Sequence, residues 1–211
     1  MANRPDFSNY LVHFTSNGQP KGGTEGNPVG DIVRLDAFER LKKILQDKRI
    51  KATRMPWTGE NAVCFTECPW SSLLAHTEKY SPYGIGFSKK LVFAKKGAPA
   101  IYIRPDHFEE QKSIGFTKHL RSFLTPFSPS YRPHKIKENQ KIGDCDYSHE
   151  REWRVPHDFS FYYKHIEFVI LNSYKDMAVF PKELQNAIGR EKFILMDNYK
   201  LVEKLWPVHK I

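Results

Sequence analysis

The stretch Glu150-Arg151-Glu152-Trp153-Arg154-Val155-Pro156 predicts a β-strand, because its large apolar side chains stand at alternate positions. Side chains alternate between the two faces of a strand, so Trp153 and Val155 share one face with Arg151. The other face then carries Glu150, Glu152 and Arg154. Two carboxylates beside a cation are costly to bury. The pattern therefore favours either a catalytic carboxylate pair in a cleft or a solvated strand face with alternating charge.

Around this stretch, short apolar strands and amphipathic helices follow one another without regular alternation. Asp36 is a candidate N-cap for a helix that carries Phe38, Leu41, Ile44 and Leu45 at helical spacing. Strands are predicted near 10–15, 50–53, 63–67, 83–87, 100–103, 166–171 and 193–196, and helices near 69–80, 106–123, 181–188 and 201–206. This order predicts an α+β fold, with a mixed or antiparallel sheet and flanking helices. We expect one domain over 1–211, with a core at 10–171 and a helix–strand–helix elaboration at 172–211.

The composition indicates a folded, basic protein. The chain has 211 residues, 14% of them aromatic, and a formal net charge of +9 with a pI near 9.4. Such a charge attracts polyanions, above all nucleic acid, although scattered lysines also serve solubility. The densest basic segment is a predicted loop that contains Arg132, Lys135, Lys137 and Lys141. These four residues are the candidate nucleic-acid contacts.

Cysteine usage and hydropathy predict a cytoplasmic protein without a membrane partner. The N-terminus lacks a signal-peptide apolar core, and no apolar run approaches membrane-spanning length. Three cysteines suit a reducing compartment. The pairs Cys64-x3-Cys68 and Cys145-x3-His149 have zinc-like spacing but lie far apart in the chain, so no metal site is predicted.

Several motifs occur together in an order that resembles the AbiGi family of abortive-infection proteins from bacterial anti-phage loci. The resemblance covers roughly 10–171, and it rests on His13-Phe14-Thr15, Val63-Cys64-Phe65-Thr66-Glu67-Cys68-Pro69, Tyr83-Gly84-Ile85-Gly86-Phe87, Gly97-Ala98-Pro99-Ala100-Ile101-Tyr102 and Glu150-Arg151-Glu152-Trp153-Arg154-Val155. The antitoxin label of the family implies a partner toxin or antitoxin protein.

The same layout more distantly resembles the DarT-type ADP-ribosyltransferases, and this likeness implies an ADP-ribosyltransferase-like fold with NAD as substrate. By that resemblance Glu152 matches the catalytic glutamate, and Glu150 completes a Glu-x-Glu pattern. His13 and Thr15 match the first-strand motif that holds the cofactor, and Tyr83 matches the aromatic residue that stacks on nicotinamide. The implied activity is transfer of ADP-ribose to a nucleic acid or protein. A fixed carboxylate would stabilise the positive charge that develops on the ribose.

Each of these residues also has a structural interpretation. His13 suits a hydrogen-bonded core histidine, Tyr83 suits ordinary aromatic packing, and Glu67 suits a structural carboxylate. Three functions stay open: an ADP-ribosyltransferase, a non-catalytic antitoxin or nucleic-acid-binding module, and a metal-dependent nuclease that uses Glu150 and Glu152. The transferase predicts that His13, Tyr83 and Glu152 converge on one pocket.

Overall fold

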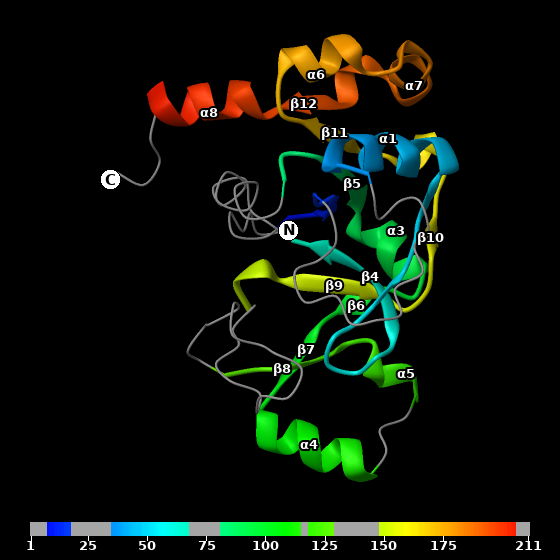
Figure 1. Ribbon diagram of the computed structural model, residues 1–211, viewed down its shortest axis with the longest axis vertical. Coiled ribbons are helices and arrows are strands. Elements are labelled where there is room, and N and C mark those ends of the chain that lie inside the picture. The colour runs from blue at the N-terminus through cyan, green and yellow to red at the C-terminus, as the bar shows by residue number, and fades with distance from the viewer. Residues whose placement is uncertain (1–7, 18–34, 68–80, 115–117, 129–147, 206–211) are drawn as a thin grey trace.

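A computed structural model describes residues 8–17, 35–67, 81–114, 118–128 and 148–205. Within them, one sheet runs through the molecule (Figure 1). Its strand order is β12 (Phe193–Leu195), β11 (Phe168–Leu171), β5 (Gly84–Ser88), β1 (Tyr10–Phe14), β4 (Asn61–Thr66), β9 (Glu152–Val155) and β6 (Ala98–Pro99), with β3 (Thr53–Arg54) also paired to β4. The pairings are antiparallel except between β11 and β12, which are parallel.

Two small sheets flank the main one. The first joins β10 (Phe159–Ser160) to β2 (Arg49–Ile50) in antiparallel fashion, and the second joins β7 (Ile101–Ile103) to β8 (Leu124–Pro126) in parallel fashion. The β7–β8 sheet lies at one end of the molecule with α4 (Pro105–Ile114) and α5 (Lys118–Arg121), as Figure 1 shows. These four elements all come from the middle of the chain, between residues 101 and 126.

The opposite end of the molecule is built from the C-terminal part of the chain (Figure 1). It contains α6 (Tyr174–Val179), α7 (Lys182–Ile188) and α8 (Met196–Leu205), together with β12. Two further helices, α1 (Ala37–Asp47) and α3 (Lys89–Ala94), lie beside the central strands, and short 3₁₀ turns occur at η3 (Ser148–Glu150), η4 (Tyr163–His165) and η5 (Arg190–Lys192). Because β12 pairs with β11, the C-terminal part of the chain extends the main sheet.

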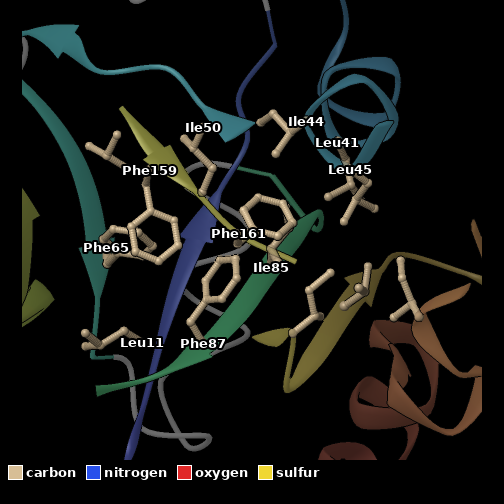
Figure 2. Packing of buried hydrophobic residues seen from close by; sticks show 14 of the residues in the cluster. Leu11, Leu41, Ile44, Leu45, Ile50, Phe65, Ile85, Phe87, Phe159 and Phe161 are labelled. Atoms are coloured by element: carbon tan, nitrogen blue, oxygen red, sulfur yellow. The ribbon is translucent and has the colours of Figure 1, made fainter. Parts of the chain in front are cut away.

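The main core lies on one face of the sheet, which we call the core face. Leu11, Phe65 and Phe87 project from the strands toward α1, which contributes Leu41, Ile44 and Leu45. Phe159 and Phe161 complete an aromatic cluster in which Phe87 contacts both rings, with centroids 4.9 and 5.1 Å apart (Figure 2). Edge-to-face aromatic contacts of this kind add to the stabilisation from area burial.

The opposite face of the sheet, which we call the far face, has a smaller cluster at the α8 end. Val12, Phe168 and Ile170 pack there with Met196 of α8. Phe168 is paired with Gly86 in the register, and a Cβ built on Gly86 would collide with the Phe168 ring. The absence of a side chain at Gly86 therefore makes room for an aromatic side chain on the neighbouring strand.

The predicted α+β class with a largely antiparallel sheet is confirmed. The predicted helix after Asp36 is confirmed as α1, and the Asp36 carboxylate accepts a hydrogen bond from the Glu39 N–H at 2.8 Å. β8 falls mostly in 125–146, which was predicted to be a loop, while α3 and α6 were not predicted at all. The predicted helix at 69–80 lies outside the described residues. None of the helices in the described parts of the chain has the length and hydrophobicity to cross a membrane.

Candidate functional site

Glu152, the candidate catalytic carboxylate, is held by Arg154. The Arg154 Nε donates to Glu152 Oε1 at 3.0 Å, and Nη2 donates to Oε2 at 2.6 Å. The two residues lie two positions apart on β9, so they share the far face as the alternation predicted. This two-point contact commits both oxygens of the carboxylate to one guanidinium.

Arg154 is almost fully buried, with 1% of its surface exposed. Its Nη1 donates to the carbonyls of Ser122 and Leu124 at 3.2 and 3.0 Å, and its Nη2 donates to the Thr125 hydroxyl at 2.5 Å. Burial by itself would lower the pKa of Arg154, but the hydrogen bond and the charge of Glu152 raise it. The guanidinium therefore stays charged and ties β9 to β8, across the boundary between the main sheet and the β7–β8 sheet.

Cys64 lies beside this pair, because it is opposite Arg154 in the β4–β9 register. Burial and the negative charge of Glu152 raise the pKa of the Cys64 thiol well above its ordinary value. A neutral thiol is a poor nucleophile and a poor metal ligand. Cys68, its partner in the zinc-like spacing, and Cys145 of the second such pair lie outside the described residues. The described part of the chain contains no cluster of three or more metal-ligating side chains.

Glu150 does not belong to the strand. β9 begins at Glu152, Glu150 ends the 3₁₀ turn η3, and Arg151 between them has a left-handed backbone with φ of 44°. The prediction that Glu150 and Glu152 share one strand face is therefore wrong, because alternation of side chains holds only within extended backbone. The Glu150 carbonyl instead accepts a hydrogen bond from the Thr66 hydroxyl.

His13, predicted to contact the cofactor, is a half-buried histidine beside the core. Its Nδ1 donates to the Cys64 carbonyl at 2.8 Å, and its ring meets Phe65 edge-on with centroids 5.9 Å apart. Burial lowers the pKa of His13, since charging the ring would cost solvation. A neutral imidazole with Nδ1 as donor leaves Nε2 as an acceptor.

Thr15 and Tyr83, the other two predicted cofactor contacts, are joined to the helices that cover the core face. The Thr15 hydroxyl donates to the Ala37 carbonyl at 2.8 Å, where α1 begins. The Tyr83 ring packs on Phe38, and its hydroxyl donates to Asp176 of α6 at 3.2 Å. Burial, together with the charge of Asp176, raises the pKa of Tyr83 to about 12.

The strand register separates these residues from Glu152. Thr66 is opposite both Val12 of β1 and Glu152 of β9. Residues directly opposite in an antiparallel pair share a face, so Val12, Thr66 and Glu152 lie on the far face and His13 lies on the core face. The prediction that His13, Tyr83 and Glu152 converge on one pocket is therefore wrong, because a one-residue step along β1 reverses the face.

The predicted nucleic-acid contacts Arg132, Lys135, Lys137 and Lys141 lie outside the described residues. Glu67 has the structural environment that its position suggested: its carboxylate is buried, pairs with Lys89 at 2.7 Å and accepts a hydrogen bond from the Ser8 N–H at 3.2 Å.

The sequence did not predict the hydrogen bonds by which Arg154 joins β9 to β8. The Glu-x-Arg spacing on a strand could have predicted the pair of Glu152 and Arg154, because it places the two side chains on one face. Nothing in the neighbouring sequence predicts that Arg154 also binds β8.

Comparisons with known proteins show the family of the chain. No curated protein and no solved structure matches the chain. A family model described as "Putative abortive phage resistance protein AbiGi, antitoxin" matches residues 42–194, which include β4, β5, β9, β11 and the first two residues of β12. This is well over half of the chain, and the chain belongs to the AbiGi family of abortive phage resistance proteins.

Proposed function

We propose that this protein is a non-catalytic antitoxin of an abortive-infection system, which acts by binding its partner toxin protein. The family description supports an antitoxin role in phage defence. The observation that most directly favours binding over ADP-ribosyl transfer is the engagement of Glu152 by Arg154. A catalytic carboxylate must be available to the reacting ribose, whereas this one already neutralises a buried cation.

The outward side of α8 offers a surface for such a partner. Leu201, Val202 and Leu205 are 55%, 58% and 73% exposed. With about 3.6 residues per turn, Leu201 and Leu205 lie on the side of the helix opposite Met196, which packs on the sheet, and Val202 lies beside them, one turn after the half-buried Tyr199. The outward side of a surface helix is ordinarily polar, so three apolar residues there are typical of an interaction site.

The apolar surface of α8 continues onto α6. The Asn198 side chain, which lies one helical turn before Leu201 and Val202, donates to the Tyr174 hydroxyl at 3.2 Å. Tyr174 is itself 64% exposed. Tyrosine is enriched where proteins bind one another, and the buried centre of such an interface is apolar. We define Tyr174, Leu201, Val202 and Leu205 as the α8 surface and propose that the toxin binds there.

The test is co-expression with the toxin encoded in the same locus. Wild-type protein should restore growth and co-purify with the toxin, whereas the pair Leu201→Ser and Leu205→Ser should weaken both. The matched control is Phe93→Ser, which removes an equally exposed apolar side chain on α3. Equal loss in the control would overturn the α8 surface.

The competing transferase function is tested on the same preparations. Purified protein is incubated with NAD and cellular nucleic acid or protein, and release of nicotinamide is followed. A binding protein should release none above background. Turnover by the wild type that disappears in Glu152→Gln would contradict the antitoxin proposal and favour ADP-ribosyl transfer.

A further inference from the structure

Three segments far apart in the chain bring lysines and tyrosines together beside the β2–β10 sheet. Lys48 caps the C-terminus of α1, and its Nζ lies 4.7 Å from the Tyr163 ring centroid. Lys95 follows α3, and its Nζ lies 5.7 Å from the buried Phe159 ring. We define the lysine–tyrosine surface by its six residues, Lys48, Lys95, Tyr162, Tyr163, Lys164 and His165.

Two hydrogen bonds within the 3₁₀ turn η4 order the segment that carries the tyrosines. The His165 N–H donates to the Tyr162 carbonyl at 2.9 Å, and the Tyr162 N–H donates to His165 Nδ1 at 3.2 Å. The next residue, Ile166, is fully buried and anchors η4 to the core. A surface that is ordered before a ligand arrives loses less conformational entropy when the ligand binds.

Within the described parts of the chain, the lysines of this surface have no acidic partner. Among the described residues, no carboxylate lies within 4.0 Å of the Nζ of Lys48, Lys95 or Lys164, whereas nearby Arg49 pairs with Asp158 at 3.7 Å and Lys43 pairs with Asp47 at 2.6 Å. Burial, followed by the charges of Lys164 and Lys95, lowers the pKa of His165, so both ammonium groups lie near one imidazole. Two ammonium groups beside His165 and a third beside the adjacent Tyr163 ring favour a ligand with several negative charges.

The aromatic part of the surface is open to a flat ligand. Tyr162 is 66% exposed, although its ring meets His165 edge-on, with centroids 5.5 Å apart, and Lys164 Nζ lies 5.9 Å from its centroid. An exposed, positioned aromatic ring among phosphate-binding cations is the combination that stacks an unpaired base. A duplex keeps its bases stacked inside and could use only the cations.

We propose that the lysine–tyrosine surface binds single-stranded nucleic acid, with backbone phosphates at Lys48, Lys95 and Lys164 and one base stacked on Tyr162. This binding is independent of the α8 surface and of toxin neutralisation. It gives a specific position to the polyanion affinity that the net charge of +9 indicates only in general.

The test is fluorescence anisotropy with labelled single-stranded DNA and RNA of about twelve nucleotides, and with a duplex of the same length, over a range of salt concentrations. The triple change Lys48→Gln, Lys95→Gln and Lys164→Gln should weaken single-strand binding by about tenfold or more and reduce the slope of log affinity against log salt by about 2. The control changes Lys175, Lys200 and Lys204 to Gln, which removes the same charge from α6 and α8 and should leave the slope nearly unchanged.

Tyr162 separates base stacking from simple attraction of charge. Tyr162→Ala should weaken single-strand binding by roughly fivefold or more, whereas Tyr162→Phe should bind like the wild type, because stacking needs the ring and not the hydroxyl. Equal losses in the two lysine variants, or single-strand binding unaffected by Tyr162→Ala, would overturn the proposal. Toxin neutralisation should be intact in every variant of the lysine–tyrosine surface, so failure of this proposal is distinguishable from failure of the antitoxin function.

Discussion

At the scale of single residues, Arg154 determines what Glu152 does. Glu152→Gln should lower the free energy of unfolding by about 2–4 kcal/mol, because it leaves the buried guanidinium without its counter-charge. Arg154→Met should lower the free energy of unfolding by about 3–5 kcal/mol, since it also removes the hydrogen-bond donor of the Ser122 and Leu124 carbonyls. Urea denaturation measures both values. The double variant should lose less than the sum of the two, and strict additivity would show that the pair is not coupled.

Tyr83 should make stability depend on alkaline pH. Its pKa in the folded protein is raised to about 12, whereas the pKa of a tyrosine in the unfolded chain is about 10. The stabilising contribution is complete below the unfolded value and is lost as the pH rises from there through the folded value, because the unfolded chain releases its proton first. Tyr83→Phe should show a shallower fall in melting temperature across this window. An unchanged profile would contradict a shift caused by burial and Asp176.

At the scale of elements, α1 shows how far local sequence determines structure. Asp36→Ala removes the acceptor for the Glu39 N–H, so it should lower the free energy of unfolding by about 1 kcal/mol. Asp47→Ala in the last turn is the control: it loses only an exposed pair with Lys43, worth at most about 0.5 kcal/mol. Thermal or urea denaturation measures both. Equal costs would show that the cap carries no special stabilisation.

Other elements depended on contacts that no local pattern contains. β8 was expected to be a loop, and only its pairing with β7 makes it a strand. The alternation of Trp153 and Val155 predicted a strand that included Glu150 and Arg151, yet the left-handed backbone at Arg151 keeps these two residues out of β9. Propensity is a weak signal for strands of two to three residues, because packing and pairing override it.

At the scale of the whole molecule, stability should be uneven. The central strands β1, β5 and β11 are buried on the core face, whereas α8 is exposed on its outward side. In native-state hydrogen exchange, the amides of the central strands should exchange by global unfolding, and those of α8 about tenfold faster or more through local opening.

Arg154→Met should accelerate hydrogen exchange in β8 more than in β5, since the guanidinium joins β8 to the main sheet. Uniform acceleration would contradict that local role.

The sequence by itself determined the α+β class, the α1 cap and the shared face of Trp153 and Val155, because each depends on periodicity or on neighbours a few residues away. Only the tertiary structure decided that Glu152 belongs to Arg154 and that His13 lies on the other face of the sheet. Which strands pair, and in which register, is set by long-range contacts, and a single step in register exchanges every side chain between the two faces. The order of motifs along the chain carries no such information.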